Sequence, residues 1–290
     1  MINLLSNGRT GTTTFGTIDN LSMVYAGNQL VKADDAGTNV TLSASMDFKN
    51  NSNTVKEYCY DLNGNLTQNL NKGITGITYN LLNSPRSITI NNALGQGINT
   101  YTYATDGRKL QLVIGDKRTD YVGNMIYENG SLKRILIDGG HIEGGAYYFY
   151  FTDHFGNNRV VANANGRDCS DKPLLSIRDV FCGGVSTSKQ PYKYNGKELD
   201  MEKELNLYDY LARLMNPVLG RFGTIDPKAE KYYGISPYAY CAVNPVNAID
   251  PDGRLVIFIN GMHFGDFKNR EDMSAYWGGF DKKVVNHIKD

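Results

Sequence analysis

The residues Tyr60-Asp61-Leu62-Asn63-Gly64-Asn65-Leu66 form the clearest copy of the pattern that decides the fold. A tyrosine stands directly before an aspartate, and a glycine follows four residues after the tyrosine. Aspartate or asparagine with glycine supplies the positive-φ positions of a tight hairpin turn, and the flanking residue types favour strands. We predict that this stretch joins two antiparallel strands through a two-residue turn, with the tyrosine entering the core.

Weaker copies of the same pattern recur along the chain, at residues 25–30, 79–88, 103–110, 120–126 and 153–160. Successive copies begin about 16 to 33 residues apart, a spacing typical of repeat architectures. Between them, runs such as Ile74–Tyr79 alternate apolar and polar residues, as strands with one buried face do. Because a single hairpin is only marginally stable in water, neighbouring copies are expected to share one sheet. The predicted fold class is therefore all-β, a curved antiparallel β-ribbon of repeat hairpins over residues 1–166.

Composition and charge argue against several classes of protein. In 290 residues, 30 lysines and arginines balance 30 aspartates and glutamates, which argues against a general nucleic-acid binder and a basic membrane-surface protein. The chain has no apolar run of about 18 residues, so we expect no membrane span. Residues 1–8 lack the basic start of a signal peptide, which predicts either export by dedicated machinery or a fragment of a longer chain.

Metal and cofactor motifs are not found in the sequence. The four cysteines, at positions 59, 169, 182 and 241, form no metal-binding pair, and there is no phosphate-binding loop or EF-hand loop. We therefore expect no cofactor and no metal. The cysteines are interpreted as buried thiols, with a disulfide between Cys169 and Cys182 as the alternative.

The residue pattern of the sequence changes after the repeats. Residues 167–190 predict a loop or boundary, and residues 191–253 form a denser segment with several turn signals. Residues 254–290 differ again: the apolar run Leu255–Ile259 predicts a buried strand, and Phe280, Val284 and Ile288 are spaced as one face of a helix. We interpret this end as the incomplete beginning of a short α/β region.

The Tyr-Asp-x-x-Gly copies resemble the YD repeats of bacterial Rhs proteins, insecticidal toxin-complex subunits and teneurins. The later segment is similar to the Rhs repeat-associated core domain through motifs at residues 192–200, 207–213, 217–222, 226–227, 236–240, 244–245 and 250–253. The resemblance covers most of residues 25–253 and implies a fragment truncated at both ends. It implies a β-shell that carries a C-terminal effector, closed at one end by the core. With this few copies we expect an open, curved sheet with residues 191–253 packed against one end.

The resemblance also implies self-cleavage, because the core of this family acts as an intramolecular aspartyl protease. Its essential arginine corresponds to Arg213, and its two carboxylates correspond to Asp226 and Asp250. The cut is expected between Arg254 and Leu255. Two carboxylates held close together cannot both ionise, so one can act as an acid while the other activates water.

Several positions depart from the family motif and leave an alternative open. Leu211 replaces a glycine, residues 214–216 replace two aromatics and an aspartate, Val243 replaces an asparagine, and Arg254 places a long cation in an apolar subsite. A core changed in this way can close the shell without cleaving. In that interpretation each aspartate only holds an Asp-Pro turn, and Arg213 forms a surface or interface ion pair.

Two functions compete on this evidence. The first is a fragment of an Rhs-type polymorphic toxin, secreted or displayed for interbacterial competition. Its expected partners are its own effector as cargo, secretion machinery and an immunity protein. The alternative is a non-cleaving YD-repeat adhesion protein at a cell surface that binds carbohydrate. Residues 255–263 resemble the first strand and turn of α/β-hydrolases, but no Gly-x-Ser-x-Gly elbow occurs, so we expect no effector enzyme here and a turn role for His263 beside Trp277.

Overall fold

The computed structural model describes residues 1–9, 14–37, 47–163, 190–231, 233–254 and 256–258. Strands dominate these residues and form two antiparallel sheets before residue 164. The first sheet contains β1 (Ile2–Arg9), β2 (Phe15–Ala26) and β3 (Gln29–Asp35). The second contains β4 (Tyr58–Tyr60), β5 (Leu66–Asn69), β6 (Ile74–Tyr79), β7 (Pro85–Asn92), β8 (Gly95–Tyr103), β9 (Lys109–Ile114), β10 (Lys117–Val122), β11 (Met125–Glu128), β12 (Ser131–Ile137), β13 (Gly140–Glu143), β14 (Ala146–Thr152) and β15 (Asn158–Asn163), with a short 3₁₀ turn, η1 (Leu70–Lys72).

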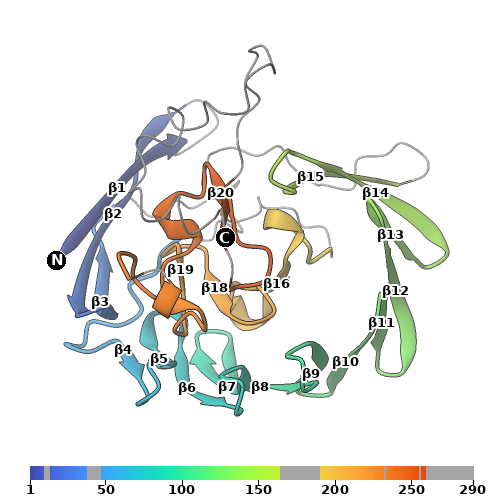
Figure 1. Cartoon of the computed structure of the whole chain (residues 1–290), viewed down its shortest axis with the longest axis horizontal. Coiled ribbons are helices and arrows are strands. Elements are labelled where there is room, and N and C mark those ends of the chain that lie inside the picture. Colours follow the sequence, from blue (N-terminus) through green and yellow to red (C-terminus); the bar gives the residue numbers. More distant parts are fainter. Residues whose placement is uncertain (10–13, 38–46, 164–189, 232, 255, 259–290) are drawn as a thin grey trace.

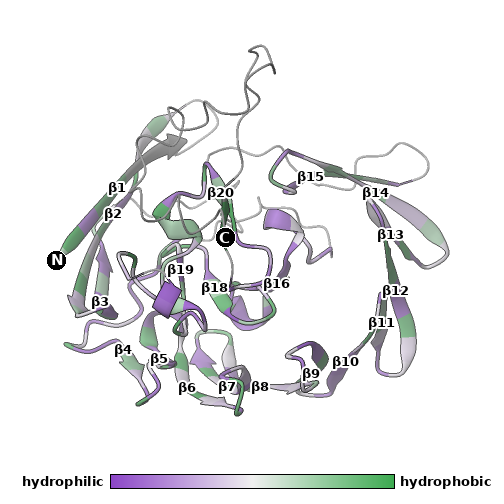
Figure 2. Ribbon diagram, viewed as in Figure 1, coloured by the Kyte–Doolittle hydropathy of each residue, from purple (hydrophilic) through white to green (hydrophobic). Residues whose placement is uncertain are grey.

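The large sheet is a meander in which every strand pairs with its neighbours in sequence, from β4 at one edge to β15 at the other. It curves into an open arc that β1–β3 continue on the left of the view (Figure 1). Hydrophobic and hydrophilic residues alternate along the arc, as strands with one buried face require (Figure 2). The predicted all-β class and the curved antiparallel ribbon are confirmed, although residues 1–35 form a sheet of their own.

The repeat turns are of two kinds, and only one was expected. Two-residue turns join β9 to β10, β10 to β11 and β12 to β13. At Asp61 the turn is longer: the Gly64 N–H donates to the Asp61 carbonyl at 3.0 Å, and Oδ1 of Asp61 accepts the N–H groups of Asn63 and Asn65 at 2.9 and 2.8 Å. The two-residue turn predicted there is wrong, because the carboxylate satisfies N–H groups that strand pairing leaves unpaired. The same backbone pattern closes the turns over residues 80–84, 104–108 and 153–157.

Replacing Gly64 with alanine is expected to destabilise the fold more than replacing Gly27 does. Both glycines lie in hairpin turns with φ of 76° and 61°, so both substitutions incur about 1 kcal/mol of backbone strain. A Cβ on Gly27 meets nothing within 4 Å, whereas one on Gly64 would overlap Ile225 and lie 2.8 Å from the Tyr238 hydroxyl. Urea unfolding should show a further loss of about 1–3 kcal/mol for Gly64→Ala. Equal losses for the two variants would contradict the close packing of this turn.

Residues 191–254 fold into a compact inner segment. Its four-stranded sheet contains β16 (Glu198–Asp200), β17 (Leu207–Asp209), β18 (Leu214–Asn216) and β19 (Arg221–Phe222), and a fourth small sheet pairs β20 (Ala248–Ile249) with β21 (Ile257–Phe258). Short 3₁₀ turns connect them: η2 (Tyr194–Gly196), η3 (Glu202–Glu204), η4 (Ala229–Lys231) and η5 (Cys241–Val243). Buried aromatic residues, among them Tyr208, Tyr210 and Phe222, form its core.

The inner segment lies within the concave side of the arc, so the expectation that it packs against one end is wrong (Figure 1). Leu205 and Leu207 join the core formed by β6–β9, and Val218 and Leu219 pack on the core of β2–β4. The Asn158 amide in β15, at the opposite edge, donates to the Tyr192 carbonyl at 2.7 Å. The segment therefore contacts the arc from its first strands to its last.

Buried ion pairs fasten the inner segment to the middle of the arc. The ammonium group of Lys109 in β9 lies 2.8 Å from Glu198 and 2.6 Å from Asp209. The Tyr121 hydroxyl donates to Glu198 at 2.8 Å. Leaving any of these buried charges unpaired would be costly, so they fix the register between sheet and segment.

The free energy of unfolding is expected to decrease as the pH rises from 4 to 6, because of Asp200, which lies at the same junction. Its carboxylate accepts the Tyr101 hydroxyl at 2.9 Å, and burial raises the pKa of Asp200 to about 6. The folded state thus binds the proton more tightly than the unfolded chain, and this stabilisation is lost as the pH rises through 6. Asp200→Asn should gain up to about 3 kcal/mol relative to wild type between pH 4 and pH 6.5 in urea unfolding. Asp34→Asn, at a site where the side chain is 45% exposed, is the control and should follow the pH profile of wild type. If the profile of Asp200→Asn ran parallel to that of wild type, it would contradict the raised pKa.

The remaining sequence predictions fall near or beyond the described residues. Ile257 and Phe258 pair with Ala248 and Ile249, so the strand expected to open a separate region is hydrogen-bonded to the inner segment. The expected helix over residues 280–288, His263, Trp277, Cys169 and Cys182 lie outside the described residues, as does most of the predicted boundary at 167–190. Of the described cysteines, Cys59 and Cys241 are free thiols. Among the described residues, no helix has the length and apolar character needed to span a membrane.

Candidate functional site

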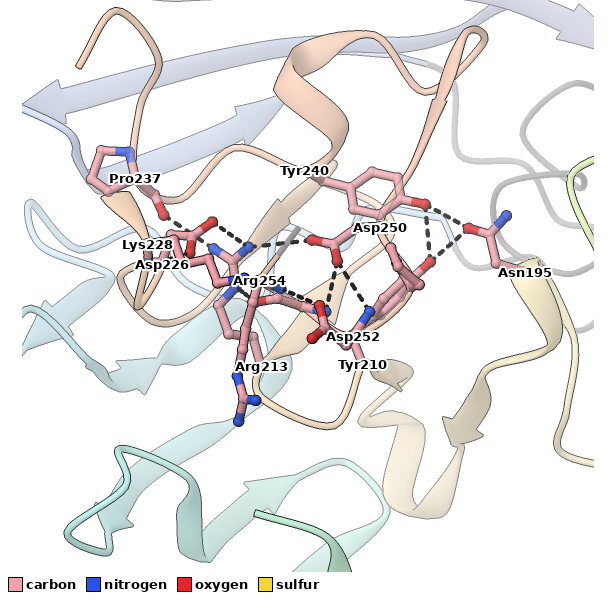
Figure 3. A network of polar contacts seen from close by, with 12 residues as sticks. Asn195, Tyr210, Arg213, Asp226, Lys228, Pro237, Tyr240, Asp250, Asp252 and Arg254 are labelled. Atoms are coloured by element: carbon pink, nitrogen blue, oxygen red, sulfur yellow. Dashed lines mark hydrogen bonds and ion pairs between the residues drawn. The ribbon is translucent and has the colours of Figure 1, made fainter. Parts of the chain in front are cut away.

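The three residues that the resemblance assigns to catalysis converge within the inner segment (Figure 3). Nη2 of Arg213 lies 2.9 Å from Oδ2 of Asp226 and 3.3 Å from Oδ2 of Asp250. The two carboxylates thus share one nitrogen, although they lie 13 and 37 residues beyond the arginine in sequence. Only the fold could show that they meet.

Tight turns bring these side chains together. The loop between β17 and β18 closes through the Tyr210 N–H, which donates to the Arg213 carbonyl at 3.0 Å. Leu211 within it has a φ of 67°, and Val243 in η5 has a φ of 62°. A left-handed backbone favours glycine or asparagine, which are the residues the family motif carries at these two positions. Both departures therefore strain the backbone locally without preventing the turns.

Each aspartate also holds its own Asp-Pro turn. Oδ1 of Asp226 accepts the Lys228 N–H at 2.7 Å, and Oδ1 of Asp250 accepts the N–H groups of Gly253 and Asp252 at 2.7 and 3.3 Å. This is the turn role that the sequence offers as the alternative to catalysis. Because the turns use Oδ1 while Arg213 contacts Oδ2, both roles fit the same carboxylate.

The site is buried, so the ion pair of Arg213 does not lie at the surface. The side chains of Arg213 and Asp250 are 1% and 0% exposed, and that of Asp226 is 11% exposed. The guanidinium lies over the Phe222 ring, 3.7 Å from its centroid. Burial raises the pKa of Asp250, although the charge of Arg213 acts in the opposite direction. The environment of Asp250 therefore favours the protonated form of its carboxyl group.

The segment that precedes the predicted cut is held tightly. Nε of Arg213 donates to the Gly253 carbonyl, and Oδ1 of Asp252 accepts the Arg254 N–H at 3.0 Å. Gly253 has a φ of 75°, and a Cβ there would lie 2.9 Å from the Tyr210 carbonyl oxygen. A side chain at this position would displace the segment from Arg213, which explains the glycine of the Asp-Pro-x-Gly motif.

Arg254 itself turns away from the two aspartates (Figure 3). Its Nη2 lies 3.3 Å from the place where a Cβ on Gly107 would stand, in the turn between β8 and β9. The long cation therefore lies against the repeat sheet, which lessens the conflict with an apolar subsite. Leu255, the other residue of the predicted cut, lies outside the described residues.

Sequence reasoning missed the polar groups around this site. The hydroxyls of Tyr210 and Tyr240 both donate to Oδ1 of Asn195, at 2.8 and 2.6 Å. Lys197 donates to the Pro251 carbonyl. The sequence did contain a sign of these groups, because Asn195 and Lys197 belong to the motif over residues 192–200 that supports the resemblance. Nothing in the sequence, however, places that motif beside residues 250–254.

The chain is similar to long curated proteins. Over 156 residues it is 34% identical to Salivary gland surface protein 1 of Aedes aegypti, covering 50% of this chain and 4% of that protein. Over 250 residues it is 24% identical to the tRNA3(Ser)-specific nuclease WapA of Bacillus spizizenii and 25% identical to the tRNA nuclease WapA of Bacillus subtilis, covering 80% of this chain and 10% of each relative. No protein-family model matches. The chain thus spans a tenth or less of these relatives.

Solved structures share the fold. A crystal structure of TcdB2-TccC3-TEV aligns with a TM-score of 0.58 at 17% identity, covering 87% of this chain and 15% of that one. The Photorhabdus luminescens Tc holotoxin pore with the TccC3-D651A mutation aligns with a TM-score of 0.58 at 17% identity, covering 86% and 14%. The fold of this chain is therefore also found in a part of each of these solved chains. Together, these likenesses support the broad resemblance to Rhs-type toxin proteins.

Proposed function

We propose that the chain is part of an Rhs-type polymorphic toxin, in which the repeat sheet and a repeat-associated core over residues 191–253 carry a C-terminal effector as cargo. The observation that supports this most is the inner segment itself, seated in the concave side of the sheet with a buried Arg213–Asp226–Asp250 cluster directly before residues 254–290. Similarity to proteins named as tRNA nucleases and to a holotoxin pore supports a role in delivery. Secretion machinery, interbacterial competition and an immunity protein belong to the same proposal.

In this proposal the cluster hydrolyses the bond between Arg254 and Leu255. Asp226 takes a proton from the attacking water, and Asp250, whose pKa burial raises, gives a proton to the departing nitrogen. The carbon–nitrogen bond breaks, leaving a carboxylate on Arg254 and an amine on Leu255. Arg213 pairs with Asp226 and holds the Gly253 carbonyl, so the bond is presented in one orientation.

Intact-mass measurement of the purified chain tests this proposal. We expect a fragment that ends at Arg254 together with the corresponding C-terminal piece. A single intact species of 32.2 kDa after prolonged incubation would remove the protease from the proposal and leave a carrier that closes without cleaving.

A second candidate, a surface protein that binds carbohydrate, is favoured by one feature of β14. Tyr147, Phe149 and Phe151 lie on the same face of this strand and remain 49%, 46% and 58% exposed. The rings of Tyr147 and Phe149 are nearly parallel, at 14°, with centroids 6.4 Å apart. A flat, exposed aromatic surface suits the apolar face of a sugar ring, and such patches mark binding sites. Similarity to a salivary gland surface protein is consistent with this function.

Immobilised glycans distinguish this second candidate. If it is correct, a glycan column retains the chain, and replacing Tyr147 and Phe149 with serine abolishes retention. Leu132→Ser, which changes a residue that is 50% exposed in β12, is the matched control and should not alter it. Absence of retention on every glycan would reject the candidate.

A further inference from the structure

Lys197, next to the proposed site, is an unusual lysine. Its ammonium group donates to the Pro251 carbonyl and lies 5.4 Å from the centroid of the Tyr210 ring. Within the described residues it takes part in no ion pair with a carboxylate. Burial lowers the pKa of Lys197, although the charges of Asp209 and Asp250 oppose this. A half-buried cation held by a carbonyl and a ring is costly, so its position calls for an explanation.

The explanation lies in the segment that Lys197 contacts. Three successive carbonyl groups before the predicted cut have donors from the inner segment: Lys197 holds that of Pro251, the Ala212 N–H holds that of Asp252 at 3.2 Å, and Arg213 holds that of Gly253. Lys197 approaches from the residue directly after η2, whereas the other two donors approach from the loop between β17 and β18. The segment is therefore clamped from two separate elements.

The turn that carries Lys197 is itself anchored to the repeat sheet. The Asn195 side chain donates to the Phe155 carbonyl at 2.8 Å, and its backbone N–H donates to Oδ1 of Asn157 at 2.9 Å. Both partners lie in the turn between β14 and β15. Lys197 thus connects the repeat sheet, through the turn that carries it, to the segment that precedes the cut.

We propose that Lys197 is a positioning residue for self-cleavage, which fixes residues 250–253 so that the Arg254–Leu255 bond meets the two aspartates. This inference rests on the proposed self-cleavage, but the positioning itself can be measured without it. The Gly253 N–H, which donates to Asp250, reports the order of the segment through its rate of hydrogen exchange.

The test compares three variants of the full chain after refolding from urea. Lys197→Met should form the fragment ending at Arg254 at least tenfold more slowly than wild type and should exchange the Gly253 N–H at least tenfold faster. Lys197→Arg, which keeps a charged donor, should remain within about threefold of wild type in both measurements. Lys203→Met is the matched control, because Lys203 also donates to a backbone carbonyl, that of Leu94 at 3.3 Å, at an exposed site; it should behave as wild type.

The outcomes separate the two ideas. If Lys197→Met cleaves and exchanges as wild type does, the positioning role is rejected. If wild type does not cleave, the proposed protease is rejected, and Gly253 exchange alone decides whether Lys197 positions the segment. If Lys197→Met loses its overall fold, Lys197→Ala, which also removes the donor, replaces it, and wild-type exchange at Gly253 in that variant overturns the inference.

Discussion

Asp226→Asn is expected to abolish the fragment that ends at Arg254. The substitution keeps an oxygen for the Lys228 N–H, so the Asp-Pro turn remains, but it removes the carboxylate that would take a proton from water. Loss of a general base reduces rates by about 10²–10⁴-fold, which puts the cut beyond ordinary incubation times. Intact-mass measurement over several days provides the readout.

Asp106→Asn is the matched control for this variant. Asp106 also accepts the N–H group two residues on, that of Arg108 at 3.0 Å, and it also forms an ion pair with an arginine. It lies at the exposed turn between β8 and β9, so its loss should leave cleavage unchanged. Cleavage of Asp226→Asn at the wild-type rate would show that Asp226 serves the turn alone.

Arg213→Met is expected to lower the free energy of unfolding by about 3–5 kcal/mol at pH 7. The variant leaves Asp250, whose side chain is 0% exposed, and Asp226 without their shared cation. The loss should be smaller at pH 4, because burial raises the pKa of Asp250 and a protonated carboxyl needs no counter-charge. Urea unfolding at the two pH values measures both quantities.

Arg108→Met is the matched control for this prediction. The Arg108–Asp106 pair has a similar short distance of 2.6 Å, but its side chains are 65% and 52% exposed. Such exposed pairs contribute little to stability, so Arg108→Met should unfold at about the same urea concentration as wild type. A similarly small loss for Arg213→Met would mean that the buried cluster does not hold the inner segment together.

The sheet could be predicted because its signals are local. Alternation between Ile74 and Tyr79, and the Asp-x-x-Gly turn after Tyr60, specify strand, turn and face within a few residues of each other. The length of that turn could not be predicted, because it depends on where one oxygen of Asp61 finds N–H groups. The repeat pattern likewise gives no sign that residues 1–35 form a separate sheet.

The position of the inner segment could not be predicted for a different reason. It depends on contacts between residues about 90 or more positions apart, such as Lys109 with Glu198 and Asp209, and no local pattern encodes them. The candidate site shows both cases. Arg213, Asp226 and Asp250 were identified through motif resemblance, whereas Lys197 and Asn195 became candidates only when the fold placed them beside residues 250–254 and the turn at residues 153–157.

The concentration dependence of cleavage tests the central proposal most directly. The chain is refolded from urea over a hundredfold range of concentration, and the new amino terminus at Leu255 is quantified over time. If the buried cluster cuts its own chain, the rate constant is the same at every concentration. A rate that rises with concentration, or a chain that never acquires an amino terminus at Leu255, would contradict it.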